Sequence, residues 1–69
     1  MDTIQLHVQV SRHDIALLCN FIAAYEGVAI VRTLDSSQGL VELLVAPAFY
    51  TTALTILQEL RQEIPLRLV

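Results

Sequence analysis

The sequence predicts an α+β domain of element order βαββαβ, in which two helices cover one face of a four-stranded antiparallel sheet. Two observations predict it: apolar residues alternate with polar ones in several short runs, and they recur at helical spacing in two longer segments between those runs. With 69 residues the chain has room for one thin core. We therefore expect a single domain over residues 1–69.

The first strand is predicted between Thr3 and Val10, where apolar and polar residues alternate strictly. Ser11 then stands at the expected N-cap of a helix, with Asp14 in the capping-box position, and Gly27 is its expected C′ residue. The apolar positions of this helix recur at helical spacing at Ile15, Leu18, Cys19 and Ile22.

A hairpin is predicted next, because residues 28–34 are rich in β-branched side chains and residues 40–45 form a second apolar run. The five residues Asp35 to Gly39 are the expected loop. Pro47 suits the first turn of a second helix, which Pro65 ends before a short last strand over residues 66–69. The expected apolar stripe of that helix is Phe49, Ala53, Ile56, Leu57, Leu60 and Ile64.

This order is the split-βαβ, or ferredoxin-like, arrangement, in which right-handed crossovers place the first and third strands in the middle of the sheet. If Leu34 pairs with Leu40 across the loop, then Arg32 faces Glu42 and the two strands present apolar side chains on both faces. We assign to the helix-covered face Val31, Val41, Leu43 and Val45, together with Ile4, Leu6 and Val8.

The opposite, open face then carries an apolar patch with a polar edge. It consists of Ile30, Leu34, Leu40 and Leu44 beside Gln5, His7, Gln9, Arg32 and Glu42. Patches of this kind usually mark interfaces, so we expect a homodimer with packed sheet faces, Ile30, Leu34, Leu40 and Leu44 being its interface residues. The alternative is that these are only scattered surface leucines.

Candidate chemistry is sparse. Ser11, His13 and Asp14 do not converge on one point, and N-capping explains the first and last of them. The open face offers His7, Arg32 and Glu42 as candidate ligand-binding residues, with a solvated histidine and a cross-strand ion pair as the simpler interpretations. We assign no catalytic residue, no metal ligand and no cofactor.

Composition excludes several functions. Four arginines and no lysine against seven acidic residues give a net charge of −3, which argues against nucleic-acid binding. The single Cys19, expected to be an inert core thiol, cannot form an internal disulfide or an iron–sulfur site. Neither a signal peptide nor a membrane span is predicted despite a mean hydropathy of +0.61, so we expect a cytoplasmic protein without membrane contact.

The segments Tyr25-Glu26-Gly27, Val31-Arg32-Thr33-Leu34-Asp35 and Gly39 to Pro47 resemble a small bacterial family catalogued as domain of unknown function 4911. The resemblance implies a bacterial cytoplasmic protein of uncharacterised role and supplies no catalytic residue. The predicted topology is also compatible with an ACT-like amino-acid sensor. Such sensors usually carry a glycine near the first strand–helix junction, and this chain lacks one there.

Our leading hypothesis is a non-catalytic binding or regulatory module that acts as a homodimer, in one version sensing a small metabolite at the interface as ACT-like domains do. The first alternative is a small enzyme or accessory subunit that uses the Arg32, Glu42 and His7 surface. The second is a structural partner in a larger complex, which would use the same face for another protein.

Overall fold

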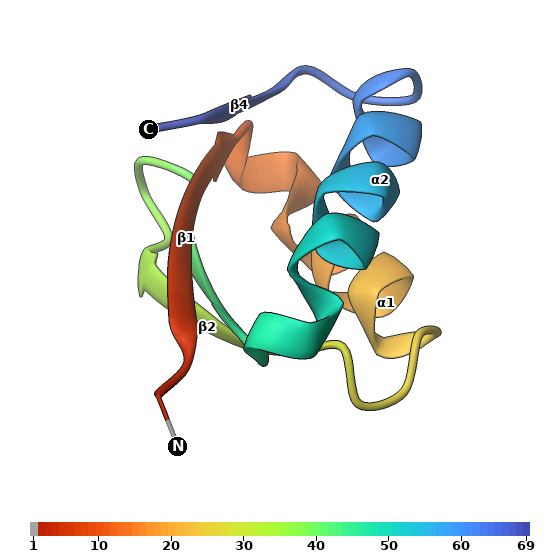
Figure 1. The fold of residues 1–69 in the computed structure, drawn as a ribbon. Helices are drawn as coiled ribbons and strands as arrows, with labels where there is room; N and C mark the ends of the chain where they lie inside the picture. The colour runs from red at the N-terminus through yellow and green to blue at the C-terminus, as the bar shows by residue number, and fades with distance from the viewer. Residues whose placement is uncertain (1) are drawn as a thin grey trace.

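Strands and helices follow one another in the predicted order in the computed structural model, which describes residues 2–69 (Figure 1). Two short 3-10 turns, η1 and η2, lead into the two α-helices. The elements are β1 (Ile4–Val10), η1 (Arg12–Asp14), α1 (Ile15–Ala23), β2 (Ala29–Asp35), β3 (Leu40–Val45), η2 (Pro47–Phe49), α2 (Tyr50–Arg61) and β4 (Leu66–Leu68). The predicted α+β class is confirmed.

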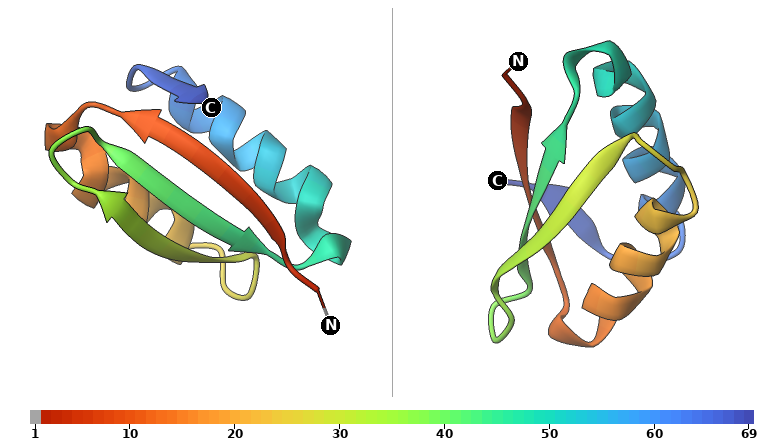
Figure 2. Two further views of the ribbon diagram at one scale, coloured as in Figure 1. Left: turned by 90° about the vertical axis from the view of Figure 1, so that its left-hand side faces the viewer. Right: turned by 90° about the horizontal axis from the view of Figure 1, so that it is seen from below.

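The sheet has the order β2-β3-β1-β4 and all of its neighbouring strands are antiparallel. The first and third strands therefore lie in the middle, as right-handed crossovers require. Figure 2 shows both helices on one side of the sheet, and no other element of residues 2–69 lies over the other side. The fold thus has two layers and one uncovered sheet face.

The core lies between the helices and the two central strands. Val8 pairs with Val41 and Leu6 with Leu43, so these side chains leave the sheet on the helix side. The side chains that fill this space are Val8, Leu18, Ile22, Val41, Leu43, Val45, Ala53, Ile56, Leu57 and Leu60, all buried. Ile4, Leu6 and Val31 share the face but are only half-buried, and Phe49 of the expected α2 stripe is exposed.

Both ends of the first helix differ from expectation. Ser11 occupies the N-cap position of η1, but its side chain makes no capping bond, because the turn is closed by main chain, with Asp14 N donating to Ser11 O at 2.8 Å. The helix ends at Ala23, before Gly27, since tight bonds such as Tyr25 N to Ile22 O replace helical ones. Gly27, with φ of 78°, instead turns the chain toward β2.

The predicted register of the hairpin is confirmed near its open end and is wrong at its loop. Arg32 pairs with Glu42 as predicted, but Asp35, not Leu34, pairs with Leu40, and the register shifts between Thr33 and Asp35. The cause is local: the Asp35 carboxylate accepts hydrogen bonds from the Ser37 hydroxyl, the Ser37 N–H and the Gln38 N–H, which makes Asp35 the last strand residue. The loop is consequently one residue shorter than predicted.

Gly39 joins the hairpin loop to the end of β1. Its φ of 69° lies in the left-handed region, and its carbonyl accepts a 2.9 Å hydrogen bond from Val10 N. A Cβ at Gly39 would collide with the carbonyl of Val10, whereas one at Gly27 would meet open space. The close approach of the two backbones at this point therefore requires glycine.

Replacing Gly39 with alanine should cost about 3 kcal/mol or more of unfolding free energy, because left-handed strain and a backbone collision combine. Gly27→Ala is the matched control, with strain alone and an expected cost of about 1–2 kcal/mol. Urea denaturation of both variants measures the difference. Equal losses would contradict the proposed collision.

The hydrogen bonds from Ser37, and then those from the backbone, lower the pKa of Asp35 below its ordinary value of 3.8. Because the folded pKa is the lower one, the stabilisation is complete above 3.8 and disappears as the pH falls through the folded pKa. Asp35→Ala should therefore destabilise the protein at neutral pH and make little difference in strong acid, as followed by urea denaturation. Asp35→Asn, which keeps an acceptor but does not titrate, should lose this pH dependence; a loss independent of pH in Asp35→Ala would contradict the assignment.

Candidate functional site

A row of three polar side chains crosses the centre of the open sheet face. Cross-strand pairing places Arg32 of β2 beside Glu42 of β3, and Glu42 beside His7 of β1. Because residues paired across an antiparallel ladder project to the same side, the three side chains lie in line. The sequence prediction that these residues share one face is confirmed, and we call them the polar row.

Glu42 is the centre of the polar row. Its Oε2 lies 3.0 Å from His7 Nε2, and its Oε1 lies 3.8 Å from Arg32 Nε. An ionised carboxylate only accepts hydrogen bonds, so the contact with His7 requires a hydrogen on Nε2. The Glu42 side chain is only 10% exposed, although it stands on the uncovered face. Its neighbours on both sides therefore shield a carboxylate that would otherwise face solvent.

Apolar side chains flank the polar row on the same face. Ile30 pairs with Leu44 on one side of the row, and Leu40 follows on the other. Ile30 is 66% exposed and Leu34 is 42% exposed, whereas Leu40 and Leu44 are half-buried. We call these four residues the open-face patch. Together with the polar row they lie on the face of the sheet that no helix within residues 2–69 covers (Figure 2).

The remaining residues singled out in the sequence do not join this surface. Ser11, His13 and Asp14 lie in or beside η1, and no side-chain hydrogen bond links them. Cys19 is half-buried on α1, less enclosed than expected. Within residues 2–69 no three His, Cys, Asp or Glu side chains gather as a metal site would require.

The pairing of His7 with Glu42 has a signal in the sequence beyond the shared face. Alternation along each strand predicts that both residues lie on one face, whereas the register between β1 and β3 brings Glu42 directly beside His7. The register follows from aligning the apolar positions of the two central strands, Leu6 with Leu43 and Val8 with Val41. That alignment places His7, which lies between Leu6 and Val8, opposite Glu42.

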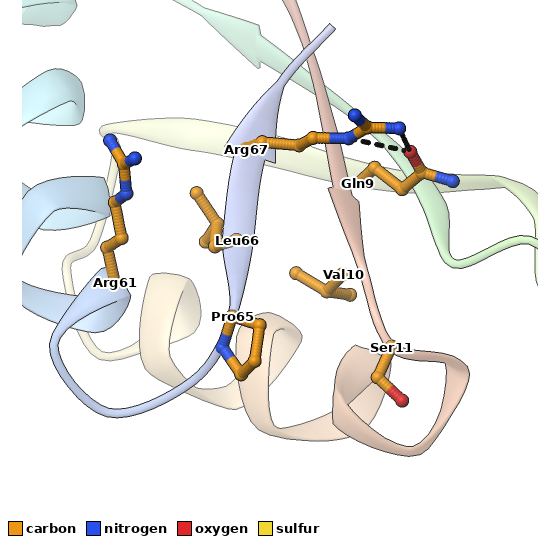
Figure 3. A pocket seen from close by; sticks show the side chains of 7 residues that line it. All are labelled: Gln9, Val10, Ser11, Arg61, Pro65, Leu66 and Arg67. Carbon is orange, nitrogen blue, oxygen red and sulfur yellow. Dashed lines mark hydrogen bonds between the residues drawn. The ribbon is translucent and has the colours of Figure 1, made fainter.

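Two cavities that were not expected lie beside the edge strand β4. The first, of about 540 Å³, lies at the end of β1 (Figure 3). Its lining residues are Gln9, Val10, Ser11, Arg61, Pro65, Leu66 and Arg67. The other, of about 460 Å³, lies between α2 and β4. Figure 3 shows the side chain of Arg67 reaching toward Gln9, and Arg67 Nε donates a 3.0 Å hydrogen bond to Gln9 Oε1. Arg61 lies on the other side of β4. These cavities depend on tertiary packing and have no sequence motif.

The close contact in the polar row predicts unequal coupling between its members. A double-mutant cycle with His7→Ala and Glu42→Ala should give an interaction free energy of about 1 kcal/mol. The corresponding cycle with Arg32→Ala should give a value near zero, because that ion pair is longer and the arginine is largely exposed. Urea denaturation measures both cycles, and a larger coupling for Arg32 would contradict the geometry.

Comparison with known proteins places the chain in a family. No curated protein and no solved structure matches it significantly. Neither helix within residues 2–69 is long and apolar enough to cross a membrane. Residues 8–64 match the family described as Domain of unknown function (DUF4911). The matched segment includes the hairpin and both helices. The match covers well over half of the chain, so the protein belongs to the DUF4911 family.

Proposed function

We propose that this protein is a non-catalytic binding or regulatory module that acts as a homodimer through its open sheet face. The observation that carries the proposal is the open-face patch, which leaves large apolar side chains exposed on a sheet whose other face already holds the core. Ile30, at 66% exposed, stands out most clearly among them. Apolar patches rimmed by polar residues are typical of protein interfaces.

The charge of the polar row suits a second copy as the partner. The carboxylate of Glu42 lies between the guanidinium of Arg32 and the imidazole of His7, so the acidic group of the row has basic neighbours within the same chain. Two such faces related by a two-fold axis present no uncompensated like charges to one another. An arginine or carboxylate without a partner here would instead favour an oppositely charged protein.

An interface of ordinary size would take up a modest share of the surface of this chain. A standard interface buries about 800 Å² on each partner, which would be a little under a fifth of the 4502 Å² surface of this chain. If half of that area is apolar, its burial at about 25 cal/mol per Å² stabilises the dimer by about 10 kcal/mol. The entropy lost on association opposes this gross value. Such a contribution is large for a domain with one thin core.

A small anionic metabolite is a further version of the proposal, as in an ACT-like sensor. The observation that favours it is the side chain of Arg32, which is 63% exposed and makes only a long ion pair. Its remaining N–H groups are free to receive a carboxylate or phosphate in the interface. A metabolite of this class should strengthen the dimer of the wild type but not that of Arg32→Ala.

A second candidate function, a small enzyme or accessory subunit, is favoured by the 3.0 Å contact between His7 and Glu42. Carboxylates orient histidines in this way when the imidazole acts as a general base. The two cavities beside β4 are lined by neither residue, however, so they do not bring a substrate to this pair. Turnover that His7→Ala abolishes without loss of stability would favour this candidate over the binding module.

Charged substitutions in the open-face patch should separate the two copies. Wild-type protein at high micromolar concentration should have about twice the 7.7 kDa mass of the chain in size-exclusion chromatography with light scattering. Ile30→Glu and Leu44→Asp should be monomers, because each buries an unpaired charge in the interface. Leu17→Glu is the matched control, since this exposed apolar residue lies on α1, and it should stay dimeric. A monomeric wild type, or dimeric Ile30 and Leu44 variants, would contradict the proposal.

A further inference from the structure

The outer edge of β4 has backbone groups available for pairing. In an antiparallel ladder, hydrogen-bonded residue pairs alternate with non-bonded ones. Val69 N donates a 2.9 Å hydrogen bond to His7 O. Arg67 and Gln9 lie opposite each other two residues away from that pair on each strand, so they form the next hydrogen-bonded pair. The N–H and C=O groups of Arg67 therefore point toward β1. Those of Leu66 and Leu68 point outward, away from the sheet, where no other strand of the described residues 2–69 pairs with them.

A groove runs beside this free edge. The cavity of about 460 Å³ between α2 and β4 is lined by Leu54, Leu57, Gln58, Arg61, Leu66, Arg67 and Leu68. Leu66 and Leu68 share the helix side of the sheet with Val10 and Val8, their cross-strand partners. Leu68 remains 51% exposed there, so an apolar side chain entering the groove would cover it. The edge thus combines unpaired backbone groups with an apolar side-chain site.

A second copy of this chain does not fit the edge well. Pairing through Leu66 and Leu68 in an antiparallel, two-fold arrangement places Leu66 of each strand opposite Leu68 of the other. Arg67 then lies directly opposite Arg67 of the second copy. Like charges in directly opposed positions destabilise a strand pair. The same position favours a partner strand with an acidic residue opposite Arg67.

Arg61 adds a second positive group at the groove. Within residues 2–69 it makes no ion pair and no side-chain hydrogen bond, although the chain as a whole carries a net charge of −3. It lies at the end of α2, on the opposite side of β4 from the guanidinium of Arg67 (Figure 3). A bound strand would therefore meet a cation on each side of the edge.

We propose that β4 accepts an extended segment of another protein, one in which acidic residues alternate with apolar ones. The segment adds a fifth strand and bonds to the outward N–H and C=O groups of Leu66 and Leu68. Its apolar side chains enter the groove against Leu57 and Leu68, while the acidic residue between them faces Arg67. The groove lies on the helix side of the sheet, away from the open-face patch, whereas Arg67 projects on the open face and adjoins the patch through Gln9.

Synthetic peptides test the proposal with full-length protein. The probe is a short acetylated and amidated peptide of alternating glutamate and leucine, labelled for fluorescence anisotropy. It should bind, and titration followed by amide NMR should shift the signals of Leu66 and Leu68 most. A peptide with lysine in place of glutamate should bind weakly or not at all. A peptide with N-methylated leucines, which keeps the side chains but removes backbone donors, should also lose binding.

Charge reversal in the protein supplies the matched controls. Arg67→Glu should weaken binding roughly tenfold, as expected of an interface anchor. Arg12→Glu makes the same charge change on η1, outside the lining of the groove, and should bind as the wild type does. The proposal is overturned if the acidic peptide does not bind at millimolar concentration, if the lysine or N-methylated peptide binds equally well, or if octanoate alone binds in the groove while the peptide does not.

Discussion

The register between β1 and β3 decides which side chains each face of the sheet receives. Val8 opposite Val41 and Leu6 opposite Leu43 send four apolar side chains toward the helices. The intervening pair, His7 and Glu42, must then project to the other side, because side chains alternate along a strand. A slip of one residue would place the carboxylate among the core leucines and the valines in solvent. The two central strands therefore fix the core and the polar row together.

The open face follows from the same constraint. β2 aligns with β3 so that Arg32 reaches Glu42, and the next outward pair is Ile30 with Leu44. A sheet with both faces rich in apolar residues needs two covering layers, and two helices supply only one of them. In our account the second layer is another copy of the chain, and the pairing of Glu42 with Arg32 and His7 within each copy allows the two faces to meet.

The strands, their order and their faces were predictable from the sequence, because a period of two over residues 4–10 and 40–45 leaves little choice of orientation. The register near the loop was not, since it depends on three hydrogen bonds that the Asp35 carboxylate accepts from its neighbours. The capping of the first helix by the Ser11 side chain was predicted from residue type and is wrong, because main-chain bonds close the turn instead. Local hydrogen bonding therefore decided the details that sequence pattern did not.

The candidate site was predictable to the same extent. Arg32, Glu42 and His7 were assigned to one face from periodicity alone, while the 3.0 Å contact that makes Glu42 the centre of the row needed the register of β1 against β3. The groove beside β4 was not predictable, because it combines α2 with a strand of three residues at the end of the fold. Its properties depend on which backbone groups of that strand point outward, and only the pairing with β1 determines this.

The central claim, that the open face is covered by a second copy, is tested most directly by isotope-filtered NMR on a mixture of labelled and unlabelled protein. Nuclear Overhauser effects between copies report contacts between their methyl groups within a few ångströms. We predict such effects from the methyl groups of Ile30 and Leu44, and none from Leu17 on α1. Contacts between copies confined to other surfaces, or their absence at millimolar concentration, would contradict the account.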